Sequence, residues 1–287
     1  MESTLRSKIE AFVAMPPSEL EGKKKAALEC FALLKQQLNE GVVRAAEPDS
    51  SSATGWRTNR WVKQGILLGF RIGVLREVES TPPWSFFDKS TVPVKSFRIE
   101  DNVRVVPGGS TVRDGAFVSN GVIIMPPAYV NIGAYIGEGT LVDSHALVGS
   151  CAQVGKRVHI SAAAQIGGVL EPAGAMPVII EDDVLLGGNT GVYEGCIVKT
   201  RAVLGTGVVL TGSTPLYDVV NDRIISRASA DEPLIIPEGA VVIAGSRSIA
   251  NRSAFAKEHS LALYTPIIIK YRDAKTDGRT ALENALR

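Results

Sequence analysis

A strict six-residue repeat of aliphatic side chains constrains the fold of this chain more than any other feature. From Val106 to Ile166 every sixth residue is Val or Ile, and a second aliphatic series runs from Ile180 to Leu210. A period of six fits neither a helix at 3.6 residues per turn nor an isolated strand at two, so it predicts stacked coils. Aliphatic residues that arrive by chance at roughly one position in four would not produce such a run.

Each hexad is interpreted as a short strand and a turn. Three hexads close a triangular coil, and coils stack at about 4.8 Å to form a prism. The eleven hexads of the first series and the six of the second predict between five and six coils. A two-residue slip separates the series at residues 171–177, where Pro172, Gly174 and Pro177 predict a loop that leaves the prism. Such a loop serves a binding face or a neighbouring subunit, or is a harmless insertion.

The segments on either side of the repeat have other patterns. Helical spacing of apolar residues predicts helices over residues 4–15, 19–39 and 56–70, with a flexible loop at 48–52. Short strands are expected after the prism, at residues 224–225, 234–236, 240–243 and 263–271, followed by a helix over 278–287. We therefore expect a helical N-terminal domain at 1–100, a β-helix domain at 101–216 and a C-terminal β region with a terminal helix at 217–287.

Composition narrows the class of protein. The 287 residues carry a formal net charge of +1, which does not suggest a surface for nucleic acid or membrane. Charged residues precede any apolar stretch at the N-terminus, and no apolar run is long enough to span a membrane, so we expect a cytoplasmic protein. The three cysteines are odd in number and lack paired spacing, which argues against a disulfide framework or a zinc site. Cys151 and Cys196 are expected to be small buried residues, not nucleophiles.

Several segments have residues that the six-residue repeat does not require. Inside the repeat these are residues 104–107, 129–135, 138–143, 148–155 and 166–172, and outside it they are 61–71 and 270–275. Together these segments resemble the tetrahydrodipicolinate N-succinyltransferase family of hexapeptide-repeat acyltransferases. The resemblance implies a left-handed parallel β-helix and a homotrimer with active sites between neighbouring prisms. It also implies transfer of a succinyl group from succinyl-CoA, as co-substrate, to the amino group of ring-opened tetrahydrodipicolinate in lysine and diaminopimelate synthesis. No bound metal or redox cofactor is expected.

The same resemblance implies roles for an aspartate and two arginines. Asp143 matches the family residue that binds the acceptor amine and assists its deprotonation, although an aspartate at a coil corner can also be a turn residue. Arg104 matches a substrate-binding arginine, and its guanidinium suits an acceptor with two carboxylates. Arg113 is a weaker candidate of the same type. Without the resemblance, Arg104 would be interpreted as a solvent-facing arginine.

The catalytic pattern of the family is incomplete in this chain. Gly191 stands where many members have a glutamate that is regarded as catalytic, and Glu194, which matches a second family glutamate, is the nearest carboxylate. His145, beside Asp143, replaces the usual tryptophan and could act as a general base, as histidine does in other hexapeptide-repeat acyltransferases. A packed or edge histidine is the more common outcome, and His159 is a weaker candidate. A metal site would need three converging histidines, which His145, His159 and the distant His259 do not suggest.

Glycine-rich turns are the candidates for coenzyme A binding, because they allow close approach and offer backbone amide donors. The predicted CoA-binding residues are Gly168, Gly188, Asn189, Gly205, Gly207 and Lys270, the last as a partner of the nucleotide phosphates together with Arg272 and Lys275. The alternative is that the glycines are turn residues at coil corners and the cations form a solvated charge run.

Two other functions stay open at this point. An N-acetyltransferase acting on the same or a related amine would differ by one carboxylate-binding contact in the donor pocket, and the sequence does not locate that contact. A structural prism without catalytic activity is the second alternative. The special segments around Asp143 and Gly168 argue against it, because packing does not require them.

Overall fold

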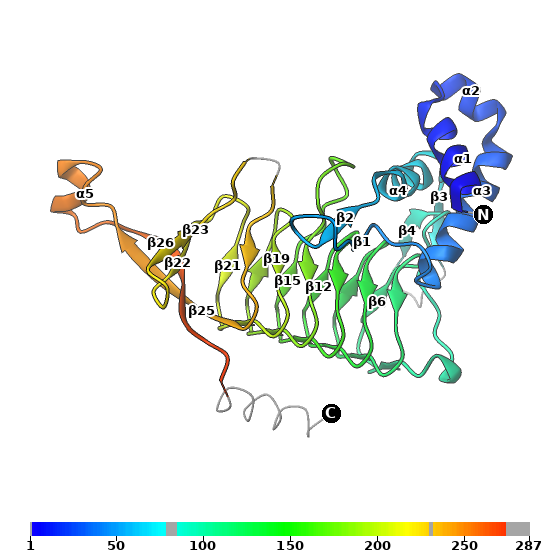
Figure 1. The fold of residues 1–287 in the computed structure, drawn as a ribbon. Coiled ribbons are helices and arrows are strands. Elements are labelled where there is room, and N and C mark those ends of the chain that lie inside the picture. Colours follow the sequence, from blue (N-terminus) through cyan, green and yellow to red (C-terminus); the bar gives the residue numbers. More distant parts are fainter. Residues whose placement is uncertain (1, 79–84, 230–231, 274–287) are drawn as a thin grey trace.

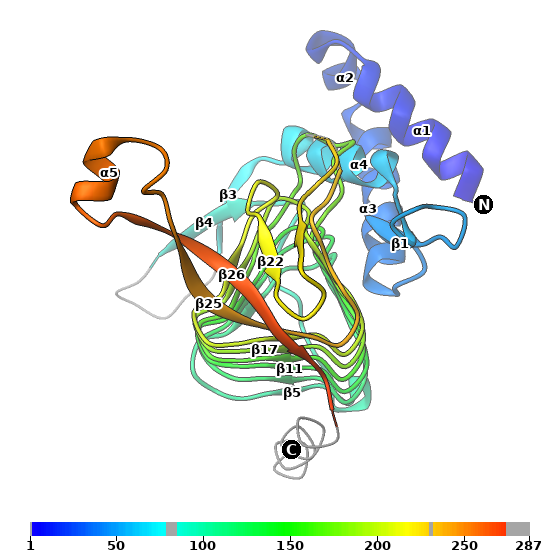
Figure 2. The same cartoon turned by 60° about the vertical axis from the view of Figure 1, so that its left-hand side comes forward.

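The protein is a left-handed parallel β-helix with a helical unit at one end and a long hairpin at the other (Figure 1). The computed structural model describes residues 2–78, 85–229 and 232–273. The fold predicted from the six-residue period is therefore confirmed. Figure 2 views the coils from a direction in which their triangular section is visible.

Three parallel sheets form the sides of the prism, here called faces A, B and C. Face A contains β5 (Arg104–Val105), β8 (Ile123–Ile124), β11 (Leu141–Val142), β14 (His159–Ile160), β17 (Leu185–Leu186), β20 (Val203–Leu204) and β25 (Ala240–Ser248). Face B contains β6 (Thr111–Val112), β9 (Tyr129–Val130), β12 (Leu147–Val148), β15 (Gln165–Ile166), β18 (Gly191–Val192) and β21 (Val209–Leu210). Face C contains β7 (Phe117–Val118), β10 (Tyr135–Ile136), β13 (Gln153–Val154), β16 (Ile179–Ile180), β19 (Ile197–Val198) and β24 (Ile235–Ile236).

The repeated aliphatic residue of each hexad points into the prism and is removed from water. Val142, Ile160 and Leu186 are fully buried members of one continuous apolar core. Burial of this kind contributes about 25 cal/mol per Å² of apolar surface, so the column of aliphatic side chains holds the coils together. The ladder continues past residue 216, because β24 pairs with β19 and β25 with β20.

The first coil corrects one assignment. Val105, and not Val106, occupies the position of the repeated aliphatic residue, because it pairs with Ile124 while Val112 pairs with Val130. The turn that contains Gly108 and Gly109 is therefore one residue longer than the later turns. Two adjacent valines fit the repeat equally well, so the sequence alone could not choose between them.

The interruption at residues 167–178 is larger than the sequence suggested. Ile166 in β15 is followed on the next face by Ile180 in β16, which pairs with β13. Fourteen residues thus stand in place of six, not twelve, and the excursion adds eight residues instead of two. Counting hexads cannot distinguish these cases, because only strand pairing shows which face the chain returns to.

Four helices form the N-terminal unit: α1 (Glu2–Ala14), α2 (Pro17–Gly22), α3 (Lys24–Asn39) and α4 (Arg60–Ile72). The predicted first helix is confirmed, but the second is broken at Lys23, next to Gly22, a residue type with low helix propensity. In the third, the first residues were wrongly assigned. Trp56–Thr58 is strand β2, which pairs with β1 (Ala46–Pro48) across the expected loop.

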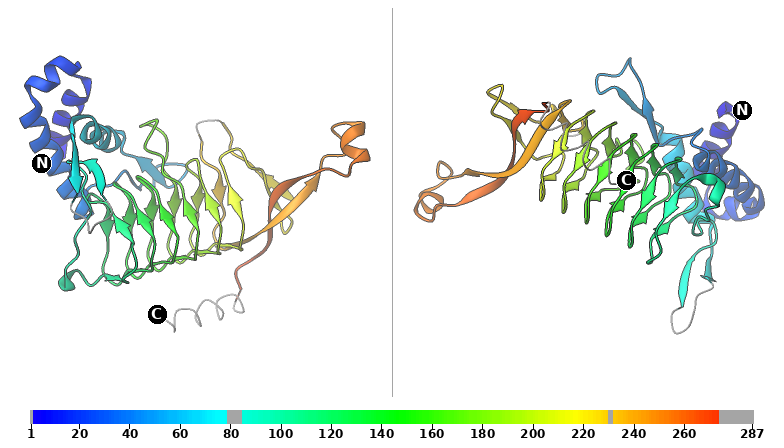
Figure 3. Two further views of the ribbon diagram at one scale, coloured as in Figure 1. Left: turned by 180° about the vertical axis from the view of Figure 1, so that it is seen from behind. Right: turned by 90° about the horizontal axis from the view of Figure 1, so that it is seen from below.

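Helix α4 joins this unit to the prism. Glycines at two positions of α4 allow close contact with α3, since a Cβ atom at Gly65 would lie 2.3 Å from Leu34 and one at Gly69 would lie 2.3 Å from Phe31. The resulting apolar cluster includes Ile132 of the prism. A short 3-10 helix, η1 (Ile99–Asp101), and the hairpin β3 (Leu75–Val78) and β4 (Phe86–Lys89) complete the region, and the hairpin projects from the prism (Figure 3).

The C-terminal region confirms the predicted strands and lengthens two of them. It contains β22 (Leu216–Asp218), β23 (Arg223–Ile225), the long hairpin of β25 and β26 (Ala262–Tyr271), and α5 (Ala254–Glu258) near the tip of that hairpin. The helix expected over 278–287 lies outside the described residues. Across the part of the chain that the structure describes, none of the helices has the length and apolar character needed to span a bilayer.

Candidate active site

The predicted site residues fall on different edges of the prism. We call the turns that lead from face A to face B the A–B edge, those from B to C the B–C edge, and those from C to A the C–A edge. The stacking of the coils places the turns of each edge in one line. The predicted residues on the A–B edge are Asp143, Gly188, Asn189, Gly205 and Gly207.

Residues of the A–B edge align in columns, one residue per coil. Asp143 and Gly205 begin their turns three coils apart, so about 14 Å separates them at a coil spacing of about 4.8 Å. Asn189 donates its backbone N–H to Ala162, and Gly207 donates its own to Gly188. The edge thus presents an acidic group at one level and small residues above it.

Asp143 is half-buried at the start of its turn. Its Oδ1 accepts a hydrogen bond from the backbone N–H of Ser144 at 2.7 Å, which fixes the carboxylate beside the turn. His145 is exposed and has a backbone φ of 63°, a left-handed conformation that recurs at Asn189 and Gly207. The backbone geometry of His145 is therefore that of a regular coil corner, where histidine is among the better-tolerated residues.

A cavity of about 800 Å³ lies on the B–C edge. Its walls come from three segments, the excursion at 167–178, the corner after β18 and the insertion between β21 and β24. The lining residues that bear charged or hydrogen-bonding side chains are Glu171, Tyr193, Glu194, Arg227 and Glu232, and Gly168 is among the small ones. Two predicted residues, Gly168 and Glu194, are therefore close to each other.

A buried lysine of α4 forms hydrogen bonds with the backbone of the excursion loop, residues 167–178. Lys63 is fully buried, and its Nζ donates to the carbonyl oxygens of Pro172 at 3.1 Å and Ala175 at 2.7 Å. Burial lowers the pKa of this amine, while the nearby Cys151 acts in the opposite direction. At Gly168, where the loop leaves the prism, the backbone packs closely against the turn of the preceding coil. A Cβ atom at Gly168 would lie 2.6 Å from the backbone nitrogen of Ser150.

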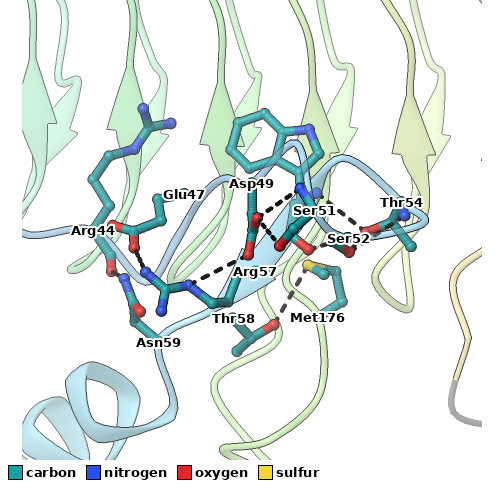
Figure 4. Close-up of polar contacts among 11 residues, drawn as sticks. Arg44, Glu47, Asp49, Ser51, Ser52, Thr54, Arg57, Thr58, Asn59 and Met176 are labelled. Atoms are coloured by element: carbon teal, nitrogen blue, oxygen red, sulfur yellow. Dashed lines mark hydrogen bonds and ion pairs between the residues drawn. The ribbon is translucent and has the colours of Figure 1, made fainter.

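The β1–β2 hairpin supports the same loop from the side of face C. In Figure 4 the side chain of Thr58 reaches Met176, and its Oγ1 donates to the sulfur at 3.4 Å. The Arg44 guanidinium lies 3.6 Å from the centroid of the Tyr135 ring and donates to Gln153, so the segment before the hairpin covers face C. The helical unit therefore shapes one wall of the cavity, since Met176 lines it.

Glu194 occupies a strained corner at the mouth of the cavity. Its φ is 51°, the next residue Gly195 has a φ of 71°, and the Glu194 side chain is exposed. Its Oε2 accepts a hydrogen bond from the backbone N–H of Gly212 at 3.0 Å. A Cβ atom at Gly212 would lie 3.2 Å from both Glu194 Oε2 and Arg227 Nη1, so an acid and a cation flank the same backbone position.

The space beside Gly191 is occupied by Tyr193. A Cβ atom at Gly191 would lie 2.5 Å from Cε2 of the tyrosine ring, closer than real Cβ atoms come to a neighbour. The ring of Tyr193 can therefore take this position only because residue 191 has no side chain.

The remaining predicted cations lie elsewhere. Arg104 is exposed on β5 of face A. Arg113 forms an ion pair with Asp88 at 2.6 Å and lies over the ring of Phe70, which links the prism to the β3–β4 hairpin. Lys270 on β26 pairs with Asp273.

Arg272 donates to the carbonyl oxygen of Asp183 on the C–A edge, and Lys275 lies outside the described residues. Residues Lys270 and Arg272 are therefore held by protein groups at the C-terminal side of the prism.

The cysteines and histidines provide neither a reactive thiol nor a metal centre among the described residues. All three cysteines are free and buried, which confirms the prediction for Cys151 and Cys196. Burial raises the pKa of Cys151 to about 12, and burial together with the Glu194 charge raises that of Cys196 to about 12. In residues 2–78, 85–229 and 232–273, no cluster of three His, Cys, Asp or Glu side chains could hold a metal ion.

Within one chain the two predicted catalytic carboxylates do not meet. Asp143 follows β11 on the A–B edge and Glu194 follows β18 on the B–C edge, with the whole of face B between them. Sequence analysis did not single out Lys63, Tyr193 or Arg227 as site residues. Lys63 lies in a segment that carries the family resemblance, but the sequence did not show that its amine would be buried under a loop more than a hundred residues away.

Comparison with known proteins shows which proteins share this architecture. A family model described as tetrahydrodipicolinate N-succinyltransferase N-terminal matches residues 4–72, and one described as hexapeptide repeat of succinyl-transferase matches residues 177–212. The 2,3,4,5-tetrahydropyridine-2,6-dicarboxylate N-succinyltransferase of Idiomarina loihiensis is 39% identical over 294 residues, which cover 100% of this chain and 99% of the relative. The protein of the same name from Herminiimonas arsenicoxydans is 39% identical over 255 residues, or 88% of this chain and 86% of the relative.

A solved structure agrees on the fold. The crystal structure of a Campylobacter jejuni protein described as a 2,3,4,5-tetrahydropyridine-2-carboxylate N-succinyltransferase matches with a TM-score of 0.53 at 17% identity. The match covers 84% of this chain and 62% of that one.

Proposed function

This chain belongs to the tetrahydrodipicolinate N-succinyltransferase family, and on that basis we propose that it transfers succinyl from succinyl-CoA to the amino group of ring-opened tetrahydrodipicolinate, a step of lysine and diaminopimelate synthesis. The observation that carries this proposal is the length of the match. The identity extends over the helical unit, the prism and the C-terminal hairpin, whereas a shared repeat alone would be confined to the prism.

The reaction makes an amide and releases a thiol. The neutral amine of the acceptor attacks the thioester carbonyl carbon, the carbon–sulfur bond breaks, and the amine proton leaves while the thiolate of CoA is protonated. The site must hold the amine close to the carbonyl, accept a proton, and donate hydrogen bonds to the developing oxyanion.

The A–B edge offers groups for these tasks. Asp143, a half-buried carboxylate held by the Ser144 N–H, would bind the acceptor amine and assist its deprotonation. Gly188, Asn189, Gly205 and Gly207 form an adjoining strip of small residues along which the pantetheine arm of CoA would lie. At Gly207 a Cβ atom would meet nothing within 4 Å, so a ligand can approach the backbone closely there.

A homotrimer with sites between subunits would bring the separated carboxylates together. Asp143 and Glu194 lie on opposite edges of face B, so a single copy leaves each predicted half-site incomplete. Leu141, Leu147 and Leu185 lie half-exposed on faces A and B, whereas the β1–β2 hairpin covers face C. We infer that faces A and B meet neighbouring copies, with the A–B edge of one prism against the B–C edge of the next. The proposed setting is the cytoplasm, where succinyl-CoA is available.

Thiol release from succinyl-CoA tests the proposal. We expect release that depends on tetrahydrodipicolinate, that exceeds release from acetyl-CoA, and that falls by about a hundredfold or more in Asp143→Asn, since loss of a proton acceptor typically costs 10²–10⁴. Asp222→Asn, at an exposed aspartate, serves as the matched control. Equal use of acetyl-CoA would assign an acetyltransferase, and the absence of acceptor-dependent release from either donor would overturn the proposal.

A further inference from the structure

Tyr193 is fixed in an unusual position at the boundary of face B and the cavity. Its ring lies against two residues without side chains: a Cβ atom at Gly167 would be 2.8 Å from Cδ1, and one at Gly191 would be 2.5 Å from Cε2. A side chain larger than hydrogen at either position would displace the ring. The two glycines thus form the floor on which the phenol rests.

The hydroxyl of Tyr193 is directed to the region that a side chain at 191 would have entered. A Cβ atom at Gly191 would lie 3.0 Å from Oη. Tyr193 lines the same cavity as Glu194 and Arg227 and is only half-buried. Among the described residues, no side chain or backbone group forms a hydrogen bond with this hydroxyl, so it is available to a ligand that reaches from the cavity over the adjoining part of face B.

We propose that Tyr193 is a substrate-contacting residue, whose hydroxyl takes the place of the absent side chain at position 191 and donates a hydrogen bond to a carboxylate of the bound acceptor. This inference rests on the proposed function. The strip expected to hold CoA lies on the A–B edge, and of the predicted CoA-binding residues only Gly168 lines the cavity on the B–C edge, so we assign the cavity to the acceptor. The acceptor is a dicarboxylate, and Arg227 supplies a cation at the same wall.

The chemistry of this replacement differs from that of a carboxylate. An ionised carboxylate only accepts hydrogen bonds, whereas a phenol donates one at neutral pH. In this chain, proton acceptance would therefore fall to Asp143 or Glu194, and Tyr193 would orient the acceptor. Loss of its hydroxyl should then affect acceptor binding more than the use of succinyl-CoA.

Steady-state kinetics of Tyr193→Phe tests the contact. Removal of a hydrogen bond to a charged group should raise the KM for the acceptor by about ten- to a hundredfold, with the KM for succinyl-CoA unchanged. Tyr135→Phe is the matched control, because that ring lies on face C beneath Arg44 and phenylalanine preserves the cation contact. If the wild type is active and Tyr193→Phe has wild-type kinetics, this inference fails while the proposed function stands. An inactive wild type would refute the function itself.

A double-mutant cycle tests the shared space. Gly191→Glu alone should lower both Tm and activity, because its Cβ would clash with the ring of Tyr193. In a Tyr193→Val background the substituted side chain at 191 has room. The activity of the double variant, relative to the wild type, should therefore exceed the product of the relative activities of the two single variants. Activities that simply multiply would show that residues 191 and 193 do not compete for one position.

Discussion

The buried lysine beneath the excursion loop provides the sharpest test of how the cavity wall is held. Lys63→Met keeps the length of the aliphatic stem and removes the ammonium that donates to Pro172 and Ala175. A hydrogen bond with a charged partner contributes about 1.5–3 kcal/mol, so two of them contribute about 3–6 kcal/mol. The variant also avoids the cost of burying a charge, which in proteins amounts to several kcal/mol.

The net loss should therefore be modest, about 2 kcal/mol in the free energy of unfolding. For a chain of this size, that corresponds to a fall in Tm of about 3 °C. The larger effect should be local, because the loop loses the two hydrogen bonds that join it to α4 and keeps only the apolar packing of Leu170 there. Limited proteolysis should then cut within residues 167–178 in the variant and not in the wild type, and acceptor-dependent activity should fall with it.

Lys25→Met is the control for this experiment, since Lys25 is an exposed lysine of α3. Its Tm, cleavage pattern and activity should equal those of the wild type. If Lys63→Met matches Lys25→Met in all three measurements, the lysine does not hold the loop and the reasoning is refuted.

Two further predictions concern a buried carboxylate of β22 and the point at which the excursion loop leaves the prism. Burial acts to raise the pKa of Asp218, but hydrogen bonds from Asn221, Tyr271 and Arg223 outweigh it and the pKa is lowered. The ionised carboxylate therefore stabilises the fold above its unfolded pKa near 3.9, and this stabilisation is lost as the pH falls through the lower folded pKa. In urea unfolding between pH 2 and 6, the free energy of unfolding of Asp218→Asn should fall less steeply with acid than that of the wild type. Parallel pH dependence of the two proteins would contradict this. Gly149→Ala should lower Tm by several degrees, because a Cβ atom there would lie 2.2 Å from the Gly168 nitrogen; an unchanged Tm would show that the loop exit can shift freely.

The sequence predicted the prism well because its period is a direct consequence of the coil. An aliphatic residue every six positions has no other regular solution, and the structure pairs those residues in register from Val112 onward. The errors arose where two assignments fit the six-residue period equally well. Val105 and Val106 fit it equally, and fourteen residues between Ile166 and Ile180 fit either one side of a coil or two.

The site was less predictable because its parts come from separate loops. The repeat places Asp143 on the A–B edge and Glu194 on the B–C edge, and counting the strands could have shown that one chain separates them. Burial of Lys63 and the position of Tyr193 over Gly191 depend on contacts between distant segments. Trp56 was assigned to a helix for the same reason, since pairing with Pro48 draws it into a strand.

Complementation between two inactive variants is the most direct test of the account as a whole. Asp143→Asn and Glu194→Gln chains, co-expressed with different affinity tags and purified through both, would form mixed assemblies. If each site joins the A–B edge of one copy to the B–C edge of another, one of the three sites in every mixed homotrimer regains both carboxylates, and succinyl-CoA-dependent activity should return to about a third of the wild-type value. Mixed assemblies as inactive as either variant alone would contradict a site shared in this way.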